Sequence, residues 1–244
     1  MFPINFTINF PPFNVATAMA GLGAWGVIIF FAYWIYKKQT AKPKVWKIAA
    51  VVLVGFFSLS FDVNMFGTAV KLSILPLGVG ILYYLLNKNK EKWQTYRAFA
   101  WLGYLANFIF LLFALLAIPV HHVLYPANEP STYLANVEDA SIIAIHPTAK
   151  ESNIHIESLK KQLPLLKQRP IHSDVWYYEM VKDKEAKERD ERFPNLLTGT
   201  ISKWGSGLNP LIFIEADGKG ILLSTPKEQF YFRSGASLLE EEVK

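Results

Sequence analysis

The chain has 244 residues, a mean hydropathy of +0.20 and a formal net charge of +5. It contains no cysteine, which excludes disulfides, thiolate metal sites and cysteine nucleophiles. Residues 1–119 carry ten Lys or Arg against two acidic side chains, whereas residues 120–244 carry fifteen against eighteen. The positive balance therefore averages two unlike halves and does not predict a nucleic-acid-binding surface.

Four apolar stretches dominate the first half of the chain. Each is close to the roughly 20 residues that a helix needs to cross a ~30 Å hydrocarbon core. We therefore predict a membrane α-helical bundle of four transmembrane helices, followed by a small α+β domain with a mainly antiparallel sheet. The predicted spans are 15–36, 46–62, 66–86 and 98–120, with a short segment 1–14 before them and the α+β domain at 121–244.

The loop charges predict the orientation of this bundle. The stretch 37–47 has five lysines and no acid, and 87–97 has four basic residues and one Glu. Short loops rich in Lys and Arg stay in the cytoplasm, so the N terminus and the domain 121–244 should lie outside the plasma membrane. A cleaved signal peptide would need a basic segment before its apolar core, but residues 1–14 carry no charge.

Three polar residues fall within the predicted spans. Asn107 should hydrogen-bond a neighbouring helix, and a short hairpin could bring Asp62 and Lys71 together. That pair is either structural, with Lys71 reaching the outer headgroups, or part of an ion or substrate path. Pro76 should kink the third span.

Small residues recur every four positions in the first span, at Ala16, Ala20 and Ala24. Such a face lets two helices approach closely. It should pack within the bundle, or else dock another membrane protein.

The second half of the chain alternates strand and helix patterns. We predict strands at Ser141–His146 and Asp174–Val181, and between them a helix over Ile154–Leu166 that bends at Pro164. The charged stretch Lys182–Arg192 should form a solvated helix. Further strands are predicted at 198–204, 211–216, 221–225 and 229–233, with Asp217-Gly218-Lys219-Gly220 as a hairpin turn and Phe230 and Phe232 opposite Tyr231. The sheet should have four or five strands.

No residue grouping predicts chemistry. The five histidines lack metal-ligand spacing, and Ser206 lacks the spacing of a nucleophile elbow. We therefore expect no catalytic, cofactor-binding or metal site. A recognition surface built from exposed aromatic residues remains, because Trp and Tyr are favoured in binding hot spots. Its candidate members are Trp176, Tyr178, Trp204 and Tyr231.

These patterns favour a multi-pass plasma-membrane protein that displays a non-enzymatic domain. The domain would bind a protein, a peptide or another component of the cell envelope. The alternative is an accessory subunit of a membrane transporter or membrane enzyme complex, docked through Ala20 and Ala24. A third hypothesis is a membrane enzyme that uses Asp62, Lys71 and Asn107.

Overall fold

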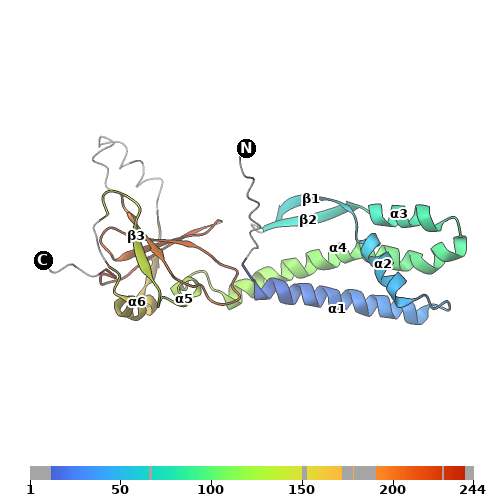
Figure 1. Cartoon of the computed structure of the whole chain (residues 1–244), viewed down its shortest axis with the longest axis horizontal. Helices are drawn as coiled ribbons and strands as arrows, with labels where there is room; N and C mark the ends of the chain where they lie inside the picture. Colours follow the sequence, from blue (N-terminus) through green and yellow to red (C-terminus); the bar gives the residue numbers. More distant parts are fainter. Residues whose placement is uncertain are drawn as a thin grey trace, which may run out of the picture. The chain divides into compact units, whose positions relative to one another are not determined.

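The computed structural model of the chain describes residues 12–65, 68–149, 153–171, 178, 191–226 and 228–239. These residues form two compact units (Figure 1). The helical unit is Val15–Val120, and the sheet unit combines the segment before Val15 with the chain from His121 onward.

Two long helices run side by side through the helical unit, α1 (Val15–Lys38) and α4 (Lys90–Leu124) (Figure 1). Within the described part of the chain, only these two are long and apolar enough to cross a membrane. They contact each other through an edge-to-face pair of Trp25 and Phe110, whose ring centroids lie 5.5 Å apart. At about 1.5 Å per residue, α1 is roughly 36 Å long, which exceeds the ~30 Å hydrocarbon core.

The prediction of four transmembrane helices is not confirmed, because the segments 46–62 and 66–86 are each part helix and part strand. The chain forms, in order, α2 (Val45–Gly55), β1 (Leu59–Met65), β2 (Thr68–Leu75) and α3 (Leu77–Leu86). The strands pair as an antiparallel hairpin that lies along α4 (Figure 1). The predicted kink at Pro76 is absent, because Pro76 lies at the N-cap of α3 and not inside a helix.

The hairpin forms because the apolar pattern changes its period. In Leu59-Ser60-Phe61-Asp62-Val63-Asn64-Met65, polar and apolar residues strictly alternate, which fits a strand and not a helix. Pairing places Ser60 opposite Ser73 and Asp62 opposite Lys71, so the polar residues share one face of the hairpin.

Polar side chains bind the backbone where α2 ends and α3 begins. Asn107 of α4 donates its amide N–H to the Phe56 carbonyl at 3.0 Å, and the Tyr104 hydroxyl donates to the Ile74 carbonyl at 3.0 Å. Ser58 and Ser73 bond each other at 2.9 Å. The Asn107 and Tyr104 contacts satisfy carbonyl groups that a continuous helix would pair internally.

Glycines allow α2, α3 and α4 to touch backbone to backbone. A Cβ added at Gly103 would overlap the Val52 carbonyl, and one added at Gly78 would overlap the Val54 carbonyl. The amide of Gly78 also donates to the Phe57 carbonyl at 2.7 Å. We call the backbone contact of Gly78 with Val54 and Phe57 the glycine node.

The described residues of the sheet unit include a six-stranded antiparallel sheet in the order β3-β5-β6-β7-β8-β4. The prediction of a mainly antiparallel sheet is confirmed, with more strands than the predicted four or five. The strands are β3 (Ser141–Ala144), β4 (Lys167–Arg169), β5 (Asn195–Thr198), β6 (Leu211–Ile214), β7 (Gly220–Ser224) and β8 (Gln229–Arg233).

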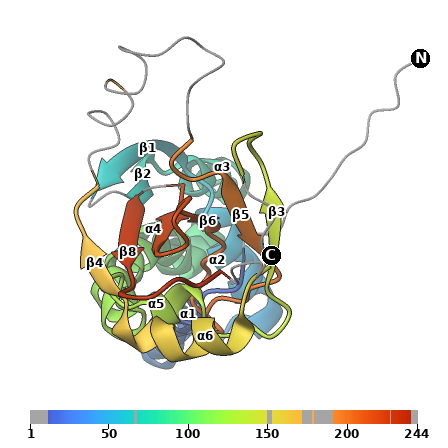
Figure 2. The ribbon, with the colours of Figure 1, turned by 90° about the vertical axis from the view of Figure 1, so that its left-hand side faces the viewer.

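Helices cover one face of this sheet. Figure 2 shows α5 (Pro130–Tyr133) and α6 (Ile156–Gln162) on the same side. A 3-10 turn, η1 (Leu163–Leu165), follows α6 where the bend at Pro164 was predicted. Fully buried side chains from helices and strands form the core: Leu134, Leu159, Ile212, Ile214, Ile221, Leu223, Phe232 and Leu238.

Alternation along the strands sends the other side chains to the opposite face, which we call the second face. Phe230 and Phe232 contact the helix-covered core, whereas Tyr231 packs with Phe193 and Leu222 on the second face. The predicted orientation of these three residues of β8 is therefore confirmed.

Two expected elements of the sheet unit differ from the structure. The strand predicted at Thr198–Trp204 is instead β5, which ends at Thr198 because Gly199 adopts φ 72°. Apart from Tyr178, the strand predicted at Asp174–Val181 lies outside the described residues, and so does nearly all of the helix predicted at Lys182–Arg192.

Ser206 holds together the two chain segments that lead into the helical unit. Its carbonyl accepts a hydrogen bond from the Asn14 amide at 3.3 Å and lies 2.8 Å from Nε2 of His121. Asn14 immediately precedes α1, and His121 belongs to the last turn of α4. Within the sheet unit, Asn14 and His121 therefore both lie beside Ser206.

Candidate functional site

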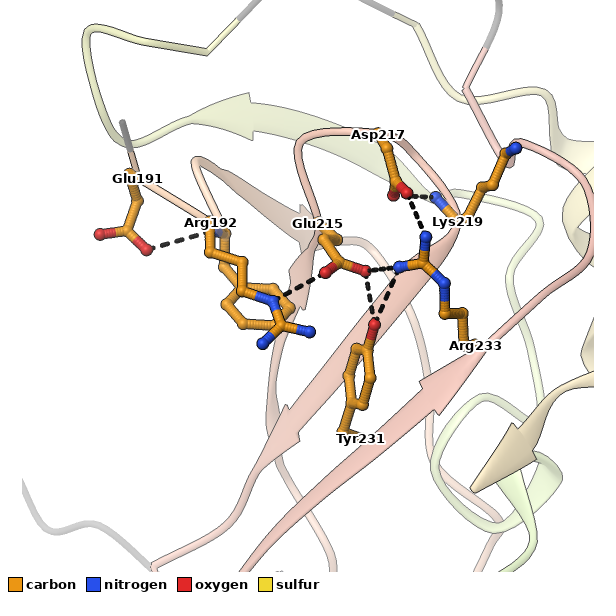
Figure 3. A network of polar contacts seen from close by, with 8 residues as sticks. Glu191, Arg192, Glu215, Asp217, Lys219, Tyr231 and Arg233 are labelled. Carbon is orange, nitrogen blue, oxygen red and sulfur yellow. Dashed lines mark hydrogen bonds and ion pairs between the residues drawn. The ribbon is translucent and has the colours of Figure 1, made fainter. Parts of the chain in front are cut away.

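A buried carboxylate organises the second face. Glu215, 8% exposed, follows β6 and accepts hydrogen bonds from Nε of Arg192 at 2.7 Å and from the Tyr231 hydroxyl at 2.5 Å. It also forms an ion pair with Arg233, whose guanidinium contacts Asp217 at 2.5 Å (Figure 3). One carboxylate thus holds two arginines and a tyrosine in fixed positions.

The strand register brings these groups together. Tyr231 pairs with Leu222 in the ladder between β7 and β8, and Arg233 pairs with Gly220. A Cβ at Gly220 would overlap Oε2 of Glu215, so only glycine leaves room for this carboxylate.

The network shifts the proton equilibria of Tyr231, Arg233 and Arg192. Burial, and then the hydrogen bond to Glu215, raise the pKa of Tyr231, so its hydroxyl remains a donor at neutral pH. Hydrogen bonding to Tyr231 and Asp217 raises the pKa of Arg233. Burial lowers the pKa of Arg192, but hydrogen bonds to Glu215 and Tyr231 outweigh it and the net shift is upward. All these groups keep their charge or proton over the physiological range.

A cleft of about 390 Å³ lies beside the network on the second face. Its apolar lining is Ile145, Ile171, Phe193, Phe213 and Leu222, and its polar lining is His146, Glu191, Arg192 and Gln229. The Arg192 guanidinium also stacks near Phe193 and Tyr231, with its carbon 5.2 Å and 5.0 Å from the two ring centroids. Arg192 therefore connects the network to the cleft.

The cleft suits the binding of an amphipathic group. Its volume lies within the ~300–1,000 Å³ typical of ligand sites, and its lining combines apolar side chains with a few polar ones. Arg192 is held by Glu215 before any ligand arrives, so little side-chain entropy is lost on binding. A fixed donor beside an apolar surface can orient a ligand that has a polar end and an apolar body.

Of the residues predicted to form an aromatic recognition surface, Tyr231 is not exposed. Tyr231 is 4% exposed and belongs to the buried network, because its position in β8 turns it toward Glu215. Tyr178 and Trp204 are 65% and 79% exposed. Trp204 stacks with Phe13, with ring centroids 5.9 Å apart, and is absent from the cleft lining. Trp176 lies outside the described residues.

The remaining predicted residues lie in the helical unit. Asp62 and Lys71 are cross-strand partners in the β1–β2 hairpin, and Asn107 bonds the backbone at the end of α2. Ala16 and Ala24 are buried at 3% and 0% exposure. Ala20, between them on α1, is half-buried.

Sequence reasoning missed Arg192, Glu215 and Arg233 as functional residues. Arg192 is placed by the sequence pattern in a solvated charged helix, yet it bonds a carboxylate 23 positions away. One signal was available: Glu215 lies near the end of the strand predicted at 211–216 and Arg233 ends the strand predicted at 229–233, and opposite charges at two strand ends are candidates for an ion pair.

Comparisons with known proteins add no further constraint, since no protein-family model, curated protein or solved structure matches this chain.

Proposed function

We propose that this chain is a multi-pass plasma-membrane protein whose sheet unit lies outside the cell and acts as a non-enzymatic binding domain. The cleft beside Arg192 is its ligand site, and a protein, a peptide or another envelope component is its ligand. The observation that carries the proposal is the preorganised Arg192–Glu215 pair at the edge of an apolar cleft.

Chain geometry supports the membrane placement. The Ser206 contacts hold the start of α1 and the end of α4 at one site, so a chain that crosses by α1 must return by α4. Between these helices, α2, the hairpin and α3 form a re-entrant segment that begins and ends at the lysine-bearing connections. The connections 37–47 and 87–97 then lie in the cytoplasm, as their charge favours.

Labelling of engineered cysteines tests this orientation, because the native chain has none. A membrane-impermeant maleimide added to intact cells should modify Glu157→Cys on α6. It should modify Thr40→Cys and Lys88→Cys only after the cells are permeabilised, since the lysine-bearing connections are placed inside. The reverse pattern would show that the orientation is wrong.

Site-specific photocrosslinking in intact cells tests the cleft. A photoreactive amino acid at Ile145 or Gln229 should give a discrete adduct, because both residues line the cleft. The same amino acid at Glu157, on the helix-covered side, should not. Arg192→Ala should reduce the Gln229 adduct by roughly tenfold, the value of one charge-assisted hydrogen bond. Equal adducts at all three positions would count against a ligand in the cleft.

The accessory-subunit hypothesis has less support. Its docking face includes Ala16, Ala20 and Ala24, but Ala16 and Ala24 are already buried. Nearby on α1, a Cβ at Gly23 would overlap the Phe113 ring of α4, with Cε1 only 2.5 Å away. This part of α1 therefore faces α4, which leaves less of it for a partner.

A further inference from the structure

A second cavity, of about 480 Å³, lies in the helical unit between the β1–β2 hairpin and α4. Its polar lining is Ser58, Ser60, Lys71, Ser73 and Asn107. Its apolar lining includes Phe56, Phe57 and, along α4, Phe110, Leu111, Ala114 and Ile118. The hairpin therefore contributes hydroxyls and a cation, whereas the lining along α4 is hydrocarbon apart from Asn107.

Lys71 is the cation of this cavity. Between Lys47 and Lys88, the only other charged residue is Asp62, its cross-strand partner. Asp62 does not line the cavity, and no ion pair joins the two side chains in the described part of the chain. An ammonium group in apolar surroundings gains strongly from an anionic partner.

The hairpin lies at the depth of the outer leaflet if the helical unit is placed as proposed above. From the cytoplasmic lysines, the 11 residues of α2 rise about 16 Å, close to the middle of a ~30 Å core. The seven residues of β1 then extend roughly 23 Å farther outward. Strand backbone at this depth is tolerated only where protein buries it or where it lines a wet cavity.

We propose that this cavity binds the phosphate of an anionic phospholipid from the outer leaflet. The Lys71 ammonium contacts the phosphate, and the hydroxyls of Ser60 and Ser73 donate hydrogen bonds to it. An acyl chain packs along Phe110, Leu111 and Ile118. Two continuous spanning helices would place apolar side chains at this depth. The hairpin instead provides a surface whose hydroxyls and one cation can hold a headgroup.

Native mass spectrometry of the full-length protein in detergent tests this site, using phosphatidylglycerol as the probe. Lys71→Gln should raise the Kd of the tightest-bound phosphatidylglycerol by roughly tenfold, because a charge-assisted contact is lost. Lys71→Arg should retain most of the affinity. Lys88→Gln, which removes an equal charge from the connection between α3 and α4, should change the Kd less than about twofold.

Two further arms identify the source of the phosphate. Phosphatidylcholine should bind more weakly than phosphatidylglycerol, because its choline offsets the phosphate charge. Inorganic phosphate at the same concentration should not compete, because it lacks the acyl chain. Equal binding to the wild-type protein and Lys71→Gln, or full competition by inorganic phosphate, would overturn the proposal.

Two considerations separate a loss of lipid binding from a folding defect and from an incorrect membrane orientation. Hydrogen exchange of the hairpin amides without lipid should be the same in Lys71→Gln and the wild-type protein. Because the binding is measured in detergent, an incorrect membrane orientation would leave it intact and would change only the leaflet that supplies the lipid.

Discussion

Replacing Glu215 with alanine should lower the free energy of unfolding of the sheet unit by about 2–3 kcal/mol. The substitution leaves the Arg192 and Arg233 guanidinium groups without their shared carboxylate, and it leaves the Tyr231 hydroxyl without its acceptor. Solvent at the two arginine side chains, which are 29% and 38% exposed, keeps the loss below that of a fully buried ion pair.

Hydrogen exchange in the full-length protein measures this loss. Amides of β7 and β8 that open through unfolding of the sheet unit should lose protection by roughly a hundredfold, since 1.36 kcal/mol corresponds to a factor of ten. Asp217→Ala is the matched control. Among the described arginines, Asp217 contacts Arg233 alone, and its side chain is 42% exposed, so the expected loss is under about 1 kcal/mol.

Equal losses in Glu215→Ala and Asp217→Ala would mean that the network is not organised around Glu215. Glu215→Gln refines the comparison, because it keeps an acceptor for Arg192 or Tyr231 but removes the charge. Its loss should fall between those of the two alanine variants.

Local patterns predicted much of the sheet unit. Asp217-Gly218-Lys219-Gly220 identified the β6–β7 hairpin because its turn chemistry is contained in four consecutive residues. Alternation at Phe230, Tyr231 and Phe232 identified which face each side chain would take. Both signals operate within a few residues, so no tertiary information was needed.

The candidate site could not be predicted in the same way. Arg192 meets Glu215 only because the chain before β5 lies beside the end of β6, and that arrangement depends on long-range pairing. Tyr231 is predicted as a surface residue because Phe230 and Phe232 face the core, and strand alternation then turns Tyr231 to the opposite face. The pattern did not reveal that the second face has a buried cluster of its own.

The helical unit was misread for a different reason. Window hydropathy measures how apolar a segment is, and it scores a short helix followed by an apolar strand much like a spanning helix. The alternating Ser60, Asp62 and Asn64, with Lys71 and Ser73 after the turn, carried the correct signal. The period of the apolar pattern, more than its total hydrophobicity, distinguishes a spanning helix from a short helix followed by a strand.

Replacing Gly78 with alanine should destabilise the helical unit strongly, by about 2–3 kcal/mol. The added methyl group would overlap the Val54 carbonyl and approach the Phe57 carbonyl at 3.0 Å. Both acceptors are backbone, so they cannot move without separating α2 from α3 at the glycine node. The loss should appear in hydrogen exchange of α2, α3 and the hairpin, with the sheet unit unchanged.

Gly80→Ala supplies the control from the same helix, since a Cβ there meets no atom within 4 Å among the described residues. This variant should be neutral or more stable by up to ~1 kcal/mol, because alanine restricts the unfolded chain and favours helix. Two independent spanning helices would have no reason to distinguish positions 78 and 80 in this way. Equal stability of the two variants would contradict the arrangement in which α2, the hairpin and α3 replace two spanning helices. A large difference between them would place α2 and α3 in backbone contact in the folded protein.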